Sequence, residues 1–246
     1  MTQKYGHYDF KVEPFEEDIM GALSWGNLGK LLLRAASFHA GAYGFGFDDV
    51  NTKSHAWVLS RLVIDVERMP RTGEAYSIES WVTRVYRQFT DRHFDILTPT
   101  GERLGQATSI WALIDMQSRQ PADLSHLSTG AMSDVMLPER EISIAGPSRM
   151  RLSKEAPLIA THKAAYSDLD INGHVNSIRY IELLLNTFGL ETLRTTPPRR
   201  IEVAYCLESY CGEQLDIYAE QQSEGTYAFE IRRGADCIVK SLILLK

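Results

Sequence analysis

Apolar and polar residues alternate along this chain with two periods, one typical of helices and one typical of strands. Two segments have the period of about 3.6 residues that marks an amphipathic helix. The apolar stripe of the first, which ends near Gly41 or Gly44, consists of Leu28, Leu31, Leu32, Ala35 and Phe38. The stripe of the second, which ends at Gly189, consists of Val175, Ile178, Ile181 or Leu184, Leu185 and Phe188.

Strand patterns follow each of these helices and form an internal repeat. Residues 61–74 (RLVIDVERMPRTGE) align without gaps with residues 200–213 (RIEVAYCLESYCGE), and both continue into alternating strand patterns. Hairpins are predicted further on, with turns at Gly101 and Gly234. The order strand, helix, antiparallel strands therefore occurs twice. It predicts an α+β fold in which a long helix is wrapped by a curved antiparallel sheet in each half.

A proline-containing segment separates the two halves. Residues 119–157 carry four prolines among polar residues and are predicted to form a surface crossover. We therefore expect an N-terminal domain at 1–118, a linker at 119–157 and a C-terminal domain at 158–246.

Composition excludes several classes of protein. The 246 residues carry a net charge of -6, which argues against nucleic-acid binding, because phosphate contacts need a basic surface. No apolar run approaches the roughly 18 residues of a membrane span, and no targeting segment is evident, so we expect a cytoplasmic protein without membrane insertion. The three cysteines form no CxxC pair, and the seven histidines do not cluster at metal-ligand spacing, so no metal site is predicted.

Candidate chemistry gathers just before the second helix, in the polar segment 167–176. Asp, Asn and Gly are normal residues of a loop and helix cap, so a simple cap is one interpretation. The alternation of Asp170, Asn172 and His174 favours a site. The start of a helix presents unpaired N–H groups and a positive dipole end, which can hold the oxyanion formed when water attacks an ester or thioester.

The same segment resembles a known family. DINGHVNSIRYIE is similar to the signature of hotdog thioesterases, and SDLDINGHVNSIRYI more narrowly resembles the acyl-acyl-carrier-protein thioesterases of plants and bacteria. In the first half, WVLSR at 57–61, RMP at 68–70 and ATSIWA at 107–112 resemble that family's first domain. The resemblance implies a tandem (double) hotdog fold.

It also implies roles for four residues. The family's Asp-x-Asn-x-His falls on Asp170, Asn172 and His174, and its downstream strand glutamate falls on Glu208. Glu208 is then the base that activates water, Asn172 helps to bind the thioester carbonyl, and Asp170 and His174 position Asn172 and the water. The implied reaction releases a free fatty acid from the acyl carrier protein and ends chain elongation in fatty acid synthesis. It needs no cofactor.

The first half lacks this set. Met69 aligns with Glu208, and no Asp-x-Asn-x-His precedes the first helix, so we expect one active site per chain, with the first half shaping the acyl pocket. Some relatives have Cys directly after the glutamate. Here Ser209 takes that place, and no GxSxG motif is present, so attack by water is favoured over attack by a protein nucleophile.

Two further sets of residues are candidates for substrate contacts. The expected lining of the acyl pocket is apolar and comprises Leu28, Leu32, Ala35, Trp57, Leu59 and Ile110. The expected docking groups for the acidic carrier protein are basic and comprise Arg84, Arg87, Arg92, Arg149, Arg151 and Lys154.

Three alternatives stay open. An acyl-CoA thioesterase of the same fold would share the phosphopantetheine arm, a hotdog dehydratase would need no carboxylate at Glu208, and a non-catalytic module would bind acyl groups without releasing acid. The preferred chain length and the choice between monomer and homodimer are not decided by the sequence.

Overall fold

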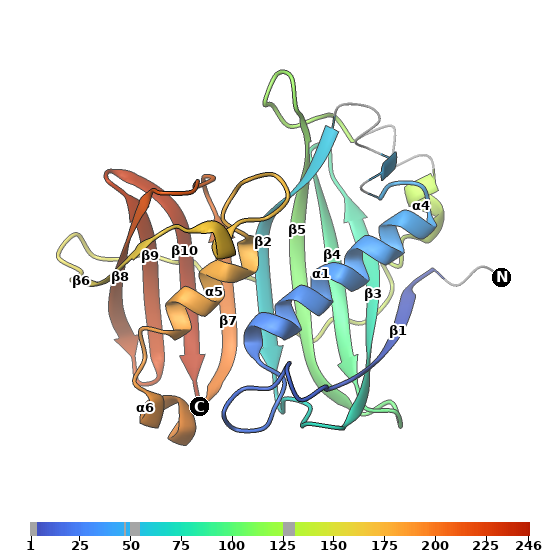
Figure 1. Ribbon diagram of the computed structural model, residues 1–246. Helices are drawn as coiled ribbons and strands as arrows, with labels where there is room; N and C mark the ends of the chain where they lie inside the picture. Colours follow the sequence, from blue (N-terminus) through green and yellow to red (C-terminus); the bar gives the residue numbers. More distant parts are fainter. Residues whose placement is uncertain (1–3, 47, 50–54, 125–130) are drawn as a thin grey trace. The chain divides into compact units, whose positions relative to one another are not determined.

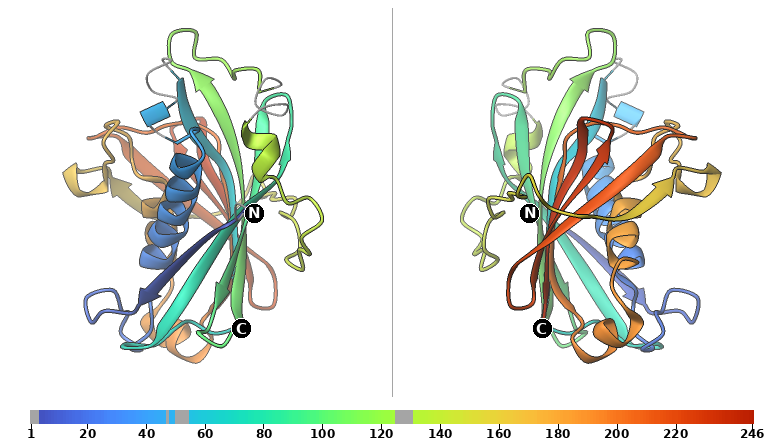
Figure 2. Two further views of the ribbon diagram at one scale, coloured as in Figure 1. Left: turned by 90° about the vertical axis from the view of Figure 1, so that its right-hand side faces the viewer. Right: turned by 90° about the vertical axis from the view of Figure 1, so that its left-hand side faces the viewer.

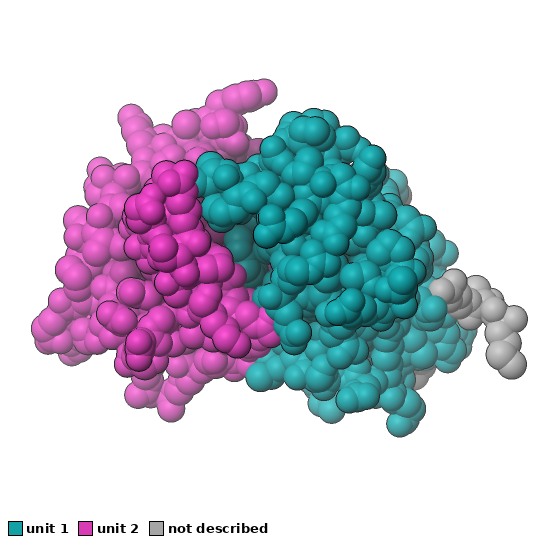
Figure 3. Space-filling model, turned by 90° about the horizontal axis from the view of Figure 1, so that it is seen from below, with its two compact units in different colours: residues 1–62, 66–145 teal, residues 63–65, 146–246 magenta. Residues whose placement is uncertain are grey.

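In the part of the chain that the structure describes, both halves share a central series of elements: a strand, a helix and four further strands. The computed structural model describes residues 4–46, 48–49, 55–124 and 131–246. It divides into unit 1, with residues 1–62 and 66–145, and unit 2, with residues 63–65 and 146–246 (Figure 3).

Unit 1 contains an antiparallel sheet with the strand order β1-β3-β4-β5-β2 (Figure 1). Its elements are β1 (Gly6–Lys11), α1 (Trp25–Ala42), β2 (His55–Val66), β3 (Ala75–Val85), β4 (Phe89–Leu97), β5 (Arg103–Asp115) and α4 (Ala131–Val135). The predicted hairpin turn joins β4 to β5, with Gly101 at a φ of +85° that favours glycine.

Unit 2 repeats this order as β6-β8-β9-β10-β7. Its elements are β6 (Leu158–Lys163), the 3₁₀ turn η1 (Tyr166–Asp168), α5 (Ser177–Leu185), α6 (Leu190–Thr195), β7 (Pro198–Tyr205), β8 (Gln214–Ser223), β9 (Thr226–Arg233) and β10 (Asp236–Leu245). The register agrees as well, because Phe10 of β1 faces Tyr76 of β3 and His162 of β6 faces Leu215 of β8. The two units therefore adopt one architecture, as the repeat predicts.

Each central helix packs one face on the sheet of its own unit. Figure 2 shows α1 on one side of the strands of unit 1. Leu28, Leu32 and Ala35 are fully buried, as their spacing predicts. Phe38 was expected in the same stripe and is 47% exposed, because it lies toward β1, where its ring meets that of Tyr8.

The second helix is shorter than its apolar pattern predicts. Asn176 caps it by accepting the backbone N–H of Ile178, and the helix ends at Leu185. Gly189 does not end this helix. It is the N-cap of α6.

The crossover follows the sheet surfaces opposite the helices. In unit 1 the guanidinium of Arg140 stacks on Trp81, 3.8 Å from the ring centroid, and pairs with Asp95 at 2.7 Å. In unit 2 the backbone N–H of Ser148 donates to Glu202 at 2.6 Å. Described residues of the crossover thus contact the second face of each sheet.

Candidate active site

The loop between η1 and α5 is a tight turn closed by the side chain of Asp170. Its carboxylate accepts the backbone N–H groups of Asn172 at 2.8 Å and His174 at 3.2 Å. Its own N–H donates to the His174 carbonyl at 2.8 Å, and Gly173 takes a φ of +77°. The Asp170 carboxylate is therefore used within the loop and holds the backbone that carries Asn172 and His174.

The structure brings His174 and Glu208 together. Nε2 of His174 lies 3.5 Å from a carboxylate oxygen of Glu208, and the two side chains are 22% and 32% exposed. Tyr210 completes the arrangement, because its hydroxyl donates to Glu208 at 3.1 Å and its ring meets the His174 ring edge to face at 5.1 Å. A half-buried imidazole and carboxylate in contact can exchange a proton with a water molecule bound beside them.

Glu208 lies in the connection from β7 to β8, and the prediction that it belongs to a strand is wrong. The ladder ends because the N–H groups of Cys206 and Leu207 both point to the carbonyl of Ile238, at 2.8 and 3.3 Å. The connection is still held in place. Val175 donates its N–H to the Ser209 carbonyl at 2.9 Å, and Arg233 donates to the Glu208 carbonyl at 3.2 Å.

The hydroxyl of Ser209 is not placed as a nucleophile. Ser209 is fully buried, and its Oγ lies 2.6 Å from the hydroxyl of Tyr180. Burial raises the pKa of Tyr180 to about 12, so this phenol stays protonated and able to donate. The arrangement supports the preference for water over a protein nucleophile.

Asn172 is exposed at the tip of the loop. Within the described ranges, no side chain forms a hydrogen bond with its amide group, so the amide is available to a ligand. The same ranges contain no group of three or more His, Cys, Asp and Glu side chains placed to hold a metal ion.

Unit 1 contains a copy of this loop that the sequence comparison missed. Asp18 accepts the backbone N–H groups of Met20 at 2.8 Å and Ala22 at 3.4 Å, and Gly21 has a φ of +70°. The isolated bridge between Ala22 and Arg71 corresponds to the one between His174 and Tyr210. The signal was present in the sequence, since DIMGALS at 18–24 parallels DINGHVN at 170–176.

This copy shows which parts of the loop are scaffold and which are chemistry. The aspartate and the glycine are retained in both units, whereas Asn172, His174 and Glu208 correspond to Met20, Ala22 and Met69. At these three positions, unit 2 therefore carries side chains that can bind a carbonyl or move a proton, and unit 1 does not.

The residues proposed for the acyl pocket do not share one surface. Leu28, Leu32 and Ala35 lie on the buried face of α1, Leu59 is buried in β2, and Trp57 is half-buried with its indole N–H on the Phe45 carbonyl at 2.8 Å. Ile110 faces away from α1, so its assignment to this pocket is wrong. It pairs with Asp91, whereas the neighbouring Arg92 points to His39 on the helix.

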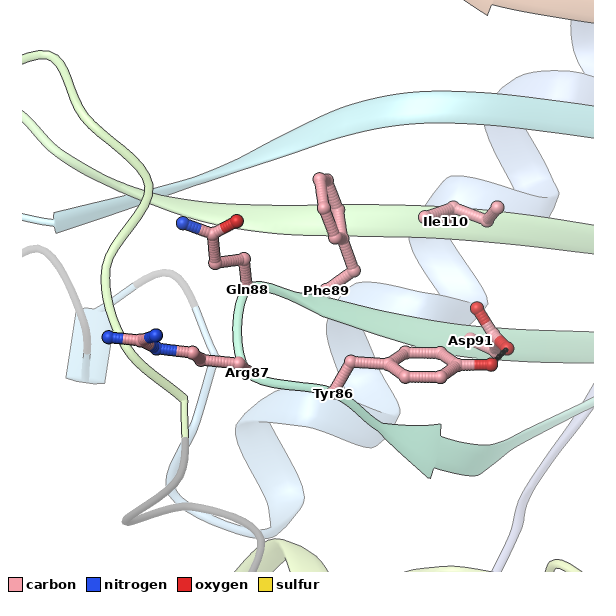
Figure 4. Close-up of a pocket in the computed structure, with 6 residues that line it drawn as sticks. All are labelled: Tyr86, Arg87, Gln88, Phe89, Asp91 and Ile110. Atoms are coloured by element: carbon pink, nitrogen blue, oxygen red, sulfur yellow. Dashed lines mark hydrogen bonds between the residues drawn. The ribbon is translucent and has the colours of Figure 1, made fainter.

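Ile110 instead lines a shallow hollow of about 490 Å³ beside the turn from β3 to β4 (Figure 4). Tyr86 and Phe89 line the hollow with it, and Tyr86 reaches across to Asp91 with a hydrogen bond of 3.0 Å. Arg87 lies at the rim and pairs with Asp123 at 3.1 Å.

Arg92 is not a docking residue, because only 5% of it is exposed. Its guanidinium donates to His39 at 2.9 Å and to Ser80 at 2.8 Å beneath α1. The other expected docking groups are exposed in two places. Arg84 and Arg87 lie in unit 1, and Arg149, Arg151 and Lys154 lie in unit 2.

Comparison with known proteins agrees with this geometry. Residues 3–126 match the sequence model of the Acyl-ACP thioesterase N-terminal domain, and residues 152–240 match that of the Acyl-ACP thioesterase C-terminal domain. The chain belongs to the acyl-ACP thioesterase family. The fold is the double hotdog of that family, with one hotdog in each unit.

Individual relatives support this membership. The crystal structure of an acyl-ACP thioesterase from Bacteroides thetaiotaomicron is 40% identical, with a TM-score of 0.92 over 99% of this chain and 98% of that one. An oleoyl-acyl carrier protein thioesterase of Arabidopsis thaliana is 28% identical over 87% of this chain, and a palmitoyl-acyl carrier protein thioesterase of Gossypium hirsutum is 26% identical over 70%. The matches span 63% and 43% of the length of these two plant proteins.

Proposed function

We propose that this chain hydrolyses the thioester of a fatty acyl-acyl carrier protein to a free fatty acid and the carrier thiol, and so ends chain elongation. The observation that carries the proposal is the contact of His174 with Glu208 at 3.5 Å, beside the loop that presents Asn172. Family membership supports the substrate class.

In the proposed reaction, the oxygen of a bound water attacks the thioester carbon while Glu208 takes one proton from that water. The π pair of the carbonyl moves to its oxygen, where the amide N–H of Asn172 donates a hydrogen bond. His174 orients the water and Glu208, and Tyr210 donates a hydrogen bond to the same carboxylate oxygen of Glu208 that lies near His174.

Collapse of the tetrahedral intermediate then breaks the carbon–sulfur bond. The electron pair of that bond leaves on sulfur, and the proton taken by Glu208 passes to the thiolate, directly or through His174. One water is consumed, and the products are a carboxylic acid and a thiol. The reaction involves no change of oxidation state and no covalent bond between the protein and the acyl group.

The basic groups of unit 2 are the better candidates for contact with the acidic carrier protein. No described residue forms an ion pair with Arg149, Arg151 or Lys154, so their charges are available to a partner. In unit 1, by contrast, Arg87 is neutralised by Asp123, and Arg84 donates to Tyr86 at 3.2 Å.

The deciding experiment compares matched acyl-carrier-protein and acyl-CoA substrates from C4 to C18 and measures the free acid and free thiol released. The proposal expects a higher kcat/KM with the carrier protein. A preference for acyl-CoA would point to the alternative thioesterase, and binding without acid release would point to a non-catalytic acyl-binding module.

A further inference from the structure

A buried carboxylate next to the catalytic loop has no part in the chemistry described so far. Asp168 ends η1 and is 1% exposed. It accepts hydrogen bonds from Nε2 of His162 at 2.6 Å, from the backbone N–H of Ala165 at 2.8 Å and from Nε of Arg179 at 2.7 Å. A buried carboxylate is stable only when its oxygens are paired in this way.

These contacts tie two elements, β6 and α5, to the turn that Asp168 ends. His162 belongs to β6, Ala165 precedes η1, and Arg179 lies in the first turn of α5. The backbone carbonyl of Asp168 also accepts the N–H of Asn176, the N-cap of α5, at 2.8 Å. Both ends of segment 169–175, which contains Asp170, Asn172 and His174, are therefore held at Asp168.

Electrostatics keep this arrangement ionised. Burial opposes the charge of Asp168, but the hydrogen bonds from Ala165, His162 and Arg179 outweigh it and hold its pKa below the usual range. Charge-assisted bonds of this kind are stronger than neutral ones. Arg179 is itself fixed by Glu182 at 2.7 Å, so the cation is held at its second edge as well.

The copy of the loop in unit 1 keeps the backbone contacts and lacks the ionic ones. The carbonyl of Glu16 accepts the N–H of Ser24 at 3.0 Å, as the carbonyl of Asp168 accepts that of Asn176. The Glu16 carboxylate accepts the N–H of Glu13 at 3.1 Å. Phe10 stands where β6 has His162, since the two strands share one register. Asn27 stands at the place of Arg179 and donates to the Glu16 carbonyl at 2.9 Å.

The extra contacts therefore occur in the unit that carries the catalytic groups. A turn that holds only Met20 and Ala22 tolerates small shifts. A turn that sets His174 against Glu208 does not, because a displacement of about 1 Å can cost about 100-fold in rate.

We propose that Asp168 is a positioning residue for thioester hydrolysis, which acts with Arg179 and His162 by fixing the loop that carries Asn172 and His174. This inference rests on the proposed function. In this role Asp168, Arg179 and His162 neither contact the substrate nor transfer a proton.

The test uses the full chain and the variant Asp168→Asn, with Glu16→Gln as the matched control in unit 1. Asp168→Asn is expected to lower kcat about 10- to 100-fold with little change in KM. Hydrogen–deuterium exchange is expected to become faster in segment 169–176 and to stay unchanged in segment 17–24. Glu16→Gln should leave kcat at the parental value.

A second pair of variants covers the case in which Asp168→Asn does not fold. Arg179 is half-buried, and Arg179→Gln should lower kcat, whereas Arg179→Lys keeps the cation and should recover much of it. The inference is overturned if folded Asp168→Asn keeps the parental kcat and exchange, or if the Lys and Gln variants lose activity equally. If the parental chain releases no fatty acid, the proposed function fails separately, and the exchange measurement still decides whether Asp168 holds the loop.

Discussion

Asp18 and Asp170 make the same two hydrogen bonds in corresponding turns of the two units. Each carboxylate accepts the N–H groups of the second and fourth residues that follow it. The residues that present those N–H groups are Met20 and Ala22 in unit 1 and Asn172 and His174 in unit 2. Because the aspartate occurs with and without the catalytic side chains, its role in both turns is to hold the backbone.

This relationship predicts a different outcome for the same substitution in the two units. Asp18→Ala and Asp170→Ala should each lower the free energy of unfolding by about 1–2 kcal/mol, since each removes two hydrogen bonds to a charged acceptor at a half-buried position. Only Asp170→Ala should also lower kcat. Urea unfolding and steady-state kinetics on both variants check this, and equal kinetic losses would contradict it.

Glu208 and its counterpart Met69 provide a matched pair for the general base. Glu208→Gln keeps the size of the side chain and removes its basicity, so kcat should fall by about 100- to 10,000-fold with a small effect on KM. Met69→Gln places the same amide at the corresponding position of unit 1 and should leave kcat unchanged. A folded Glu208→Gln variant with the parental rate would exclude this residue as the base.

Much of the fold and part of the site could be predicted from the sequence. The buried stripe of α1 follows from the helical spacing of its apolar residues. The turns at Gly101 and Gly234 follow from the positive φ that glycine allows. The pairing of His174 with Glu208 came from a family motif. The alignment of residues 61–74 with residues 200–213 places Met69 at the position of Glu208 and so indicates a single active site per chain.

The errors have a common physical cause. Arg92 is hydrophilic by type and is buried because His39 and Ser80, from distant segments, accept its hydrogen bonds. Ile110 is apolar and lies on the sheet face that points away from α1. It was wrongly assigned because alternation along a strand does not say which face the helix covers. The contacts of Asp168 also join separate elements. None of these facts can be inferred from spacing along the chain.

Charge reversal tests which basic surface meets the carrier protein. The double variant Arg149→Glu/Arg151→Glu should raise KM for acyl-carrier protein several-fold and KM for acyl-CoA much less, because CoA carries phosphates but no acidic protein surface. The effect should weaken as salt is added. Arg84→Glu/Arg87→Glu is the control in unit 1. A larger effect of that pair would move the docking surface to the hollow beside Tyr86 and Phe89.

The buried His39 predicts that the folded state loses stability in mild acid. Burial, together with the nearby Arg92 cation, lowers the pKa of His39 to about 4, against 6.5 for an ordinary histidine. The unfolded chain therefore binds a proton between these values that the folded chain does not. The contribution of His39 to the free energy of unfolding is fully present above about pH 6.5. It is lost as the pH drops toward 4, and the loss amounts to at most about 3 kcal/mol.

His39→Gln isolates this contribution, because the amide oxygen of glutamine can still accept the hydrogen bond from Arg92 and cannot be protonated in this range. Its free energy of unfolding, measured in urea at several pH values, should fall less between pH 6.5 and 4 than that of the parental chain. His7→Gln is the control, since the hydrogen bond to Glu79 raises the pKa of His7 and this variant should not flatten the curve. Parallel curves for His39→Gln and the parental chain would show that His39 titrates normally in the folded protein.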